Sequence, residues 1–152
     1  MHEPLDAEEM SLWHAWKLAA DTVRARIAAD IAAAVGLSDA DFGVLTRVAE
    51  LGGGRMRQNA LAESMGWHRS RLSHQLTRME QRGLVTRRGV DGGVEVQLTD
   101  IGRDYAKAAR PVHAAAVRHH LIDRLSPSQR RQLRHALDAL TAQRAGSPRG
   151  QA

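Results

Sequence analysis

The chain has 152 residues, a net charge of +5, no cysteine and only 3% aromatic residues. This length suits one compact domain, or one domain with a helical extension, and the absence of cysteine excludes disulfides, thiolate zinc sites and thiol-based redox switches within this chain. Because many of the apolar residues are alanine, which buries little area, we expect long, closely packed helices and a second subunit to complete the core.

The basic excess is confined to residues 55–88. This window contains eight arginines against two acids, Glu63 and Glu80, so its net charge is +6 and the rest of the chain sums to −1. The arginines are Arg55, Arg57, Arg69, Arg71, Arg78, Arg82, Arg87 and Arg88. A basic excess restricted to one segment is typical of a surface that binds a polyanion such as nucleic acid.

Four helices are predicted in the first half of the chain. The first covers Ala7–Val35, where apolar residues recur at three- and four-residue steps, and a glycine ends it. Ser38 caps the second helix, which ends at the glycine run 52–54. A short third helix is predicted over Gln58–Met65 and a fourth over Arg69–Arg82.

A hairpin and two further helices follow. Leu84–Arg88 and Val94–Leu98 are predicted to be antiparallel strands, because apolar and polar residues alternate in the second and an Asp-Gly-Gly turn separates them. A fifth helix is predicted over 100–122 and, after a Ser-Pro-Ser-Gln capping box, a sixth over 127–144. The predicted fold is mainly α with a small two-stranded β wing, a winged helix-turn-helix between long terminal helices.

The fourth helix presents side chains of the kind that read DNA. Its apolar residues recur at i, i+4 and i+7 and face the core. The opposite side is expected to show Ser70, Arg71, His74, Gln75 and Arg78. Arginine suits guanine and glutamine suits adenine in the major groove, while serine and histidine suit bases or phosphates. The residues expected to hold phosphates around this helix are Arg57, Gln58, Arg69, Arg87 and Arg88.

Several short motifs follow one another along the chain. They are Ala60-Leu61-Ala62-Glu63, Met65-Gly66, His68-Arg69-Ser70-Arg71-Leu72-Ser73, Met79-Glu80, Arg82-Gly83-Leu84-Val85 and Leu98-Thr99-x-x-Gly102. This ordered series resembles the MarR family of bacterial winged-helix regulators, and the resemblance covers roughly Trp16–Leu140. It implies an obligate homodimer whose terminal helices interlock and whose recognition helices enter successive major grooves of a pseudo-palindromic operator in double-stranded DNA.

The resemblance also implies roles for parts of the chain. The residues that fall where family members touch bases are Ser70, Arg71, His74 and Gln75. The whole chain is expected to be one domain, with dimerisation helices over 7–37 and 100–144, a DNA-binding lobe over 38–99 and a disordered tail over 145–152. The wing departs from the family pattern, because its tip, Asp91–Gly93, lacks the arginine that family members place in the minor groove.

Trp13 and Trp16 lie one turn apart on the first helix, and two interpretations are open. Large apolar side chains on an alanine-rich helix favour packing in a dimer core. The other interpretation is an aromatic wall for a planar ligand between the dimer helices and the DNA-binding lobe. Trp16 resembles the first-helix tryptophan of the MarR branch that responds to urate and related aromatic compounds. Trp67 is expected to be a hydrophobic plug before the recognition helix.

The remaining residues give no sign of metal or catalysis. His113 and His120 are seven residues apart, about 10 Å along a helix, which is too far to share an ion. We find no Gly-rich phosphate loop, cysteine nucleophile or acid pair, and expect no enzyme, metal or cofactor. The sequence has no signal-peptide pattern and no apolar run of membrane length, so we expect a cytoplasmic protein that does not bind membranes.

Two classes of function fit these residues. The first is a sequence-specific transcriptional regulator, a homodimeric repressor released by a small aromatic ligand. The second is a non-catalytic winged helix that binds DNA architecturally or contacts a partner protein. A basic helix face that is merely solvated is the third, functionless interpretation.

Overall fold

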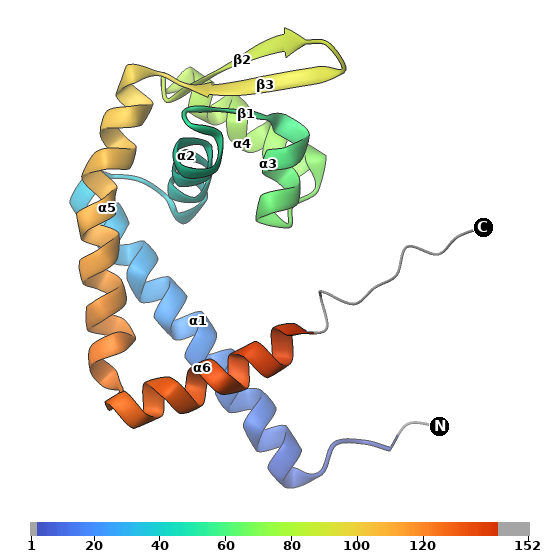
Figure 1. Ribbon diagram of the computed structural model, residues 1–152, viewed down its shortest axis with the longest axis vertical. Coiled ribbons are helices and arrows are strands. Elements are labelled where there is room, and N and C mark those ends of the chain that lie inside the picture. The colour runs from blue at the N-terminus through green and yellow to red at the C-terminus, as the bar shows by residue number, and fades with distance from the viewer. Residues whose placement is uncertain (1–2, 143–152) are drawn as a thin grey trace.

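The computed structural model describes residues 3–142, which form six α-helices, one 3-10 turn and a small sheet (Figure 1). In chain order the elements are α1 (Ala7–Val35), α2 (Asp39–Gly52), β1 (Arg55–Arg57), α3 (Gln58–Met65), α4 (Arg69–Gln81), β2 (Val85–Val90), β3 (Gly93–Leu98), α5 (Asp100–His120), the 3-10 turn η1 (Ile122–Arg124) and α6 (Pro127–Thr141). The predicted disordered tail, 145–152, lies outside the described residues, as do positions 143 and 144 of the sixth helix. The predicted mainly α fold with a β wing is confirmed.

The helices begin and end where local capping chemistry places them. Ser38 accepts a hydrogen bond from the backbone N–H of Asp41, whose own carboxylate accepts from the Ser38 N–H, so the two form a capping box for α2. Thr99 caps α5 through its side chain, and Ser126 with Gln129 forms the predicted capping box of α6. Gly36 ends α1 with φ at +72°, a left-handed conformation that glycine adopts without strain.

The sheet has three strands, one more than predicted. Its order is β1-β3-β2 with antiparallel pairing, so Val96 in the middle strand lies opposite Met56 on one side and Arg87 on the other. β2 and β3 form the predicted hairpin, which extends beyond the lobe as the wing (Figure 1). β1 has only three residues and becomes a strand by pairing with β3. No sequence pattern within residues 55–57 predicts this pairing.

The core lies in a lobe built from α2, α3, α4 and the sheet, and the C-terminal part of α1 and the first half of α5 pack onto it. Leu45, Leu61, Leu76 and Leu98 are among its fully buried side chains. α5 approaches the lobe closely at Gly102, where an added Cβ would lie 2.0 Å from the Leu84 carbonyl oxygen. Only glycine permits this approach, and it fixes the long helix against the base of the wing.

The C-terminal part of α1 packs against α5, while its N-terminal part extends away from both α5 and the lobe, and α6 lies on the side of the molecule remote from the wing (Figure 1). Large apolar side chains of α1 and α6 are solvent-exposed in the single chain; Leu12, Leu18 and Leu140 are each about 70% exposed (72%, 70% and 69%). α6 has no buried residue among those described. No helix within residues 3–142 has the length and apolarity needed to cross a membrane.

Candidate nucleic-acid interface

α3 and α4 form the predicted helix-turn-helix, and α4 buries the side that periodicity indicated. Leu72, Leu76 and Met79 are fully buried, and Gly66 turns the chain between the two helices with φ at +64°. The predicted DNA-binding residues that α4 exposes are Arg69, Ser70, Arg71, His74 and Arg78. This face of α4 is therefore polar, cationic and open to solvent.

Both helices of this unit begin without a side-chain cap. The N-cap residues are Arg57 for α3 and His68 for α4; neither makes a capping hydrogen bond, and neither helix has an acidic residue in its first turn. In contrast, α1, α2, α5 and α6 are each capped by a side chain. Free backbone N–H groups at the positive end of a helix bind phosphate readily. The two helices thus combine arginine charge with available N–H groups.

The predicted exposure of Gln75 is wrong, because this residue is buried and only 4% exposed. Its Nε2 donates to Asp41 Oδ1 at 2.8 Å, and its Oε1 accepts from Arg78 Nη2 at 2.6 Å. Position 75 is three residues after Leu72 and four before Met79, which places it on the buried stripe of α4. Gln75 therefore ties α4 to the start of α2.

The carboxylate of Asp41 is the centre of this contact and is 3% exposed. Besides Gln75, it accepts from Arg82 Nη1 at 2.7 Å and from the Ser38 backbone N–H at 3.1 Å. One buried acid thus joins the capping box of α2 to both the middle and the end of α4. Hydrogen bonds to a buried charge are directional and costly to break, so this acid fixes the orientation of α4.

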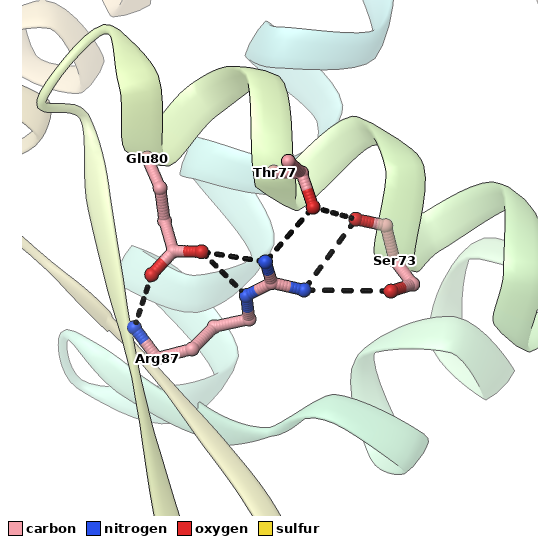
Figure 2. A network of polar contacts seen from close by, with 4 residues as sticks. All are labelled: Ser73, Thr77, Glu80 and Arg87. Carbon is pink, nitrogen blue, oxygen red and sulfur yellow. Dashed lines mark hydrogen bonds and ion pairs between the residues drawn. The ribbon is translucent and has the colours of Figure 1, made fainter.

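The guanidinium of Arg87 is engaged by α4 on all three nitrogens (Figure 2). Glu80 Oε1 accepts from Arg87 Nε at 2.7 Å and lies 2.6 Å from its Nη2, and Glu80 Oε2 accepts from the Arg87 backbone N–H at 3.1 Å. Arg87 Nη2 also donates to Thr77 Oγ1 at 2.9 Å, and Nη1 donates to the Ser73 hydroxyl at 3.4 Å. Arg87 therefore fastens strand β2 of the wing to the recognition helix.

Arg57 lies beside the tip of the wing. Its Nη1 donates to the Asp91 carbonyl oxygen at 2.6 Å, and a Cβ added at Gly92 or Gly93 would lie 4.0 or 3.9 Å from the same nitrogen. The wing tip has no arginine of its own, and Arg57, from the start of α3, brings a guanidinium there. This placement could not be read from sequence, because 34 residues separate Arg57 from Asp91.

The two remaining predicted phosphate ligands differ in exposure. Arg88 pairs with Glu95 across the hairpin at 2.8 Å, and its side chain stays 64% exposed. Gln58 is half-buried at the start of α3, and its Oε1 is buried without a hydrogen-bond partner in the described part of the chain. Arg88 is therefore accessible to a backbone phosphate, while Gln58 is accessible only in part.

A cavity of about 300 Å³ lies between the lobe and the long helices α1 and α5. Its lining includes Arg24, Asp39, Phe42, Arg47, Trp67 and His113, so two guanidinium groups face it against one carboxylate. The Phe42 and His113 rings lie 4.9 Å apart, centroid to centroid. Arg47 donates to two backbone carbonyl oxygens, at 3.3 and 3.4 Å, and to no carboxylate among the described residues. The cavity therefore combines aromatic surfaces with guanidinium groups, which suits a small planar anion.

Sequence reasoning expected a ligand site between the dimer helices and the lobe but missed the residues that line this cavity, because its walls come from α1, α2, the α3–α4 turn and α5. The predicted ligand residues Trp13 and Trp16 are not part of its lining. They lie in the N-terminal half of α1 and are 48% and 43% exposed. Lys17 Nζ lies 5.0 Å from the centroid of the Trp13 ring. Trp67, expected to be a plug, packs against the core and also lines the cavity.

The histidines of α5 take part in separate contacts. His113 lies against Phe42, and His120 Nε2 lies 2.8 Å from Asp30 Oδ2. Within residues 3–142 no group of three or more His, Cys, Asp or Glu side chains is arranged to hold a metal ion.

Residues 36–90 match a family model described as a domain of unknown function, DUF7343. No curated protein matches the chain significantly. Among solved structures, RdhR-CbdbA1625, an organohalide-sensing transcriptional regulator solved with 2,4-dichlorophenol bound, is 19% identical. The alignment covers 94% of this chain and 87% of that one with a TM-score of 0.77, so this likeness shows the fold alone.

Two regulators from Streptomyces coelicolor are more similar. Sco3205, a MarR family transcriptional regulator solved in complex with DNA, is 29% identical, with 99% of this chain and 96% of that one covered and a TM-score of 0.85. AbsC, also a MarR family transcriptional regulator, is 31% identical, with 96% of this chain and 100% of that one covered and a TM-score of 0.84. The winged helix, its basic recognition face and this identity over the whole length agree: the chain belongs to the MarR family of DNA-binding transcriptional regulators.

Proposed function

We propose that the protein is a homodimeric repressor that binds a pseudo-palindromic operator through α4 and is released by a small aromatic acid. The observation that carries this proposal is the exposed face of α4, where Ser70, Arg71 and His74 extend from an uncapped helix N-terminus. The N-terminal residues of a recognition helix are those that reach base edges in the major groove. The likeness to Sco3205, which was solved in complex with DNA, supports DNA binding by this chain.

The proposed contacts divide into three groups. Ser70, Arg71 and His74 read bases. The residues that hold phosphates are Arg57, Gln58, Arg69, Arg78 and Arg88. Gln75 and Arg87 hold α4 and the wing in place instead of touching DNA, since their side chains are engaged within the protein.

The apolar side chains left exposed on the terminal helices support the homodimer. α6 has no fully buried residue within the described chain, and Trp13, Trp16 and Leu140 are 48%, 43% and 69% exposed. A two-fold axis between the terminal helices would cover these side chains and present α4 twice, about 34–36 Å apart for adjacent half-sites. Residues 7–37 and 100–144 then serve dimerisation, and residues 38–99 form the DNA-binding lobe.

The proposed ligand site is the cavity between this lobe and the long helices. Phe42, Trp67 and His113 offer aromatic faces, while Arg24 and Arg47 offer positive charge to a carboxylate. RdhR-CbdbA1625, which shares the fold, was solved with an aromatic compound bound. A second candidate ligand site has Trp13 and Trp16 as one wall and is completed by the partner subunit. A releasing ligand must bind the DNA-incompetent dimer more tightly, and a coupling of about 1–3 kcal/mol is typical.

The experiment that tests DNA recognition is selection of genomic fragments by the pure protein, followed by sequencing. A specific regulator should recover one shared motif with two inverted half-sites. Fragments without a common motif would contradict the proposal and support an architectural DNA-binding role. Failure to recover any DNA would support a winged helix that contacts protein.

The experiment that tests release is titration of the protein–operator complex with salicylate or urate. We expect DNA affinity to fall about 5- to 150-fold at saturation. Arg47→Ala should keep operator binding and lose the response, because it removes a cavity charge without touching α4. A response unchanged by Arg47→Ala would place the ligand elsewhere.

A further inference from the structure

Trp67 lies where the cavity meets the recognition helix. Its backbone N–H donates to the Ala62 carbonyl oxygen at 3.0 Å, directly after the left-handed Gly66, so its main chain is held by the end of α3. Its half-buried indole packs against the core and forms part of the cavity wall. The residue immediately after it, His68, is the N-cap of α4.

Arg71 lies on the same indole. Its guanidinium carbon is 3.9 Å from the centroid of the Trp67 ring, within the range of a cation–π contact. Among the described residues no carboxylate forms an ion pair with Arg71. The first turn of a helix also disfavours a cation. The indole is thus the group that holds this exposed arginine in one position.

A stacked guanidinium keeps its N–H groups free. Stacking uses the flat face of the group, whereas the donors that recognise guanine O6 and N7 lie along its edge. Arg71 can therefore rest on Trp67 and read a base at the same time. Holding the side chain in advance lowers the conformational entropy lost on binding DNA.

We propose that Trp67 is a positioning residue that holds Arg71 for base reading and transmits occupancy of the cavity to it. This inference rests on the proposed function, since it needs both an operator and a cavity ligand. A planar anion that contacts or displaces the indole from the cavity side changes the surface on which Arg71 rests. The operator then needs Arg71 in one position, and the cavity ligand favours another. This competition couples ligand binding to DNA binding.

The first test is a double-mutant cycle on operator affinity with Trp67→Leu, Arg71→Ala and the double variant. Trp67→Leu keeps apolar volume but removes the aromatic face. It should weaken operator binding about three- to tenfold, as expected for loss of a cation–π contact, and leave affinity for a random duplex unchanged. In the Arg71→Ala background the same change should have no further effect, and Trp67→Phe should restore most of the loss.

Two results would overturn the positioning role. One is additivity, in which Trp67→Leu weakens operator binding equally with and without Arg71. The other is an equal loss on operator and random DNA, which indicates damage to the whole lobe. If Trp67→Leu does not fold, Trp67→Met, which also lacks an aromatic face, replaces it in the same cycle and must couple to Arg71→Ala.

The second test uses tryptophan fluorescence with salicylate as the probe. Salicylate should change the emission of the wild-type protein, and Trp67→Phe should abolish this change although Trp13 and Trp16 remain. A change that persists in Trp67→Phe, or no change in the wild type, would overturn the link to the cavity. Failure of the proposed function looks different, because the wild-type protein would then not distinguish operator from random DNA at all.

Discussion

Asp41 is a buried charge whose partners lie on two helices, and its contact with Gln75 leads to a stability prediction. Gln75→Ala leaves Asp41 with one donor fewer and should lower the free energy of unfolding by about 1–3 kcal/mol. Urea denaturation of the purified variant measures this loss. His74→Ala, at an exposed position on the same helix, is the matched control and should change stability by less than about 0.5 kcal/mol. Equal stability of the two variants would contradict the role given to Gln75.

The arginines of the interface should separate into two classes on DNA. Arg71→Ala should cost about 1–3 kcal/mol on the operator and little on random DNA, because it removes a base contact. Arg57→Ala should weaken both alike and lower the salt slope by about one, because it removes a charge from the wing tip that holds the backbone. Titrations at several salt concentrations measure both effects.

The control for these titrations is Arg110→Ala, which removes one positive charge outside residues 55–88. Arg110 pairs with Glu50 on α2, so the variant should bind operator and random DNA nearly as the wild type does. If Arg71→Ala and Arg57→Ala lowered specific and random binding by the same factors, α4 would not be the base-reading helix.

At the scale of elements, the contact between the wing and α4 predicts a change in DNA affinity opposite in direction to the change expected from charge alone. Glu80→Ala raises the net charge by one, so electrostatics alone predicts stronger DNA binding. We expect weaker DNA binding, because Arg87 loses its main partner and no longer holds the wing against α4. The free energy needed to open the wing should fall by about 1–2 kcal/mol, as expected for partly exposed charged groups. Operator affinity and hydrogen exchange of residues 85–98 measure the two consequences.

Stronger operator binding by Glu80→Ala, with hydrogen exchange of the wing unchanged, would show that Arg87 does not support the recognition helix. Thr86→Ala is a suitable control, because Thr86 is an exposed residue of the same strand. It should change neither measurement.

The helices were predictable because their ends are coded locally. Ser38, Thr99 and Ser126 cap the helices that follow them, and Gly36 and Gly66 end helices in the left-handed conformation. Each of these signals acts over three or four residues, so the sequence around it is sufficient. β1 has no such signal, because its three residues become a strand only through pairing with β3, about 40 residues later.

The part of the candidate site that could be predicted from the sequence is the set of side chains whose role depends only on their being exposed. The polar face of α4 followed from helical periodicity, but the partners of its side chains did not. Gln75 bonds Asp41, 34 residues earlier, and Arg57 bonds the wing tip, 34 residues later. Such contacts depend on how elements pack, as does the cavity, whose lining comes from several separate segments.

The whole molecule should be a dimer held by its terminal helices. Leu137→Glu places an unpaired charge on the apolar side of α6, and burying it would be costly. We expect the variant to be a monomer or an aggregate at micromolar concentration, where the wild type has the mass of two chains. Light scattering on both proteins measures this.

The matched control is His135→Glu, which adds a negative charge on the opposite side of the same helix, about 200° from Leu137. This variant should remain a dimer. A folded wild-type monomer at micromolar concentration would contradict the assembly, and so would a Leu137→Glu variant that stays dimeric.

The most direct test of the whole account is the ratio of two affinities of the wild-type dimer at one salt concentration. One is for the operator, and the other is for a shuffled duplex of the same length and base composition. A dimer that reads bases with two α4 helices should prefer the operator by about 10³ or more. Equal affinity for both duplexes would contradict sequence-specific regulation, whatever the charge on α4.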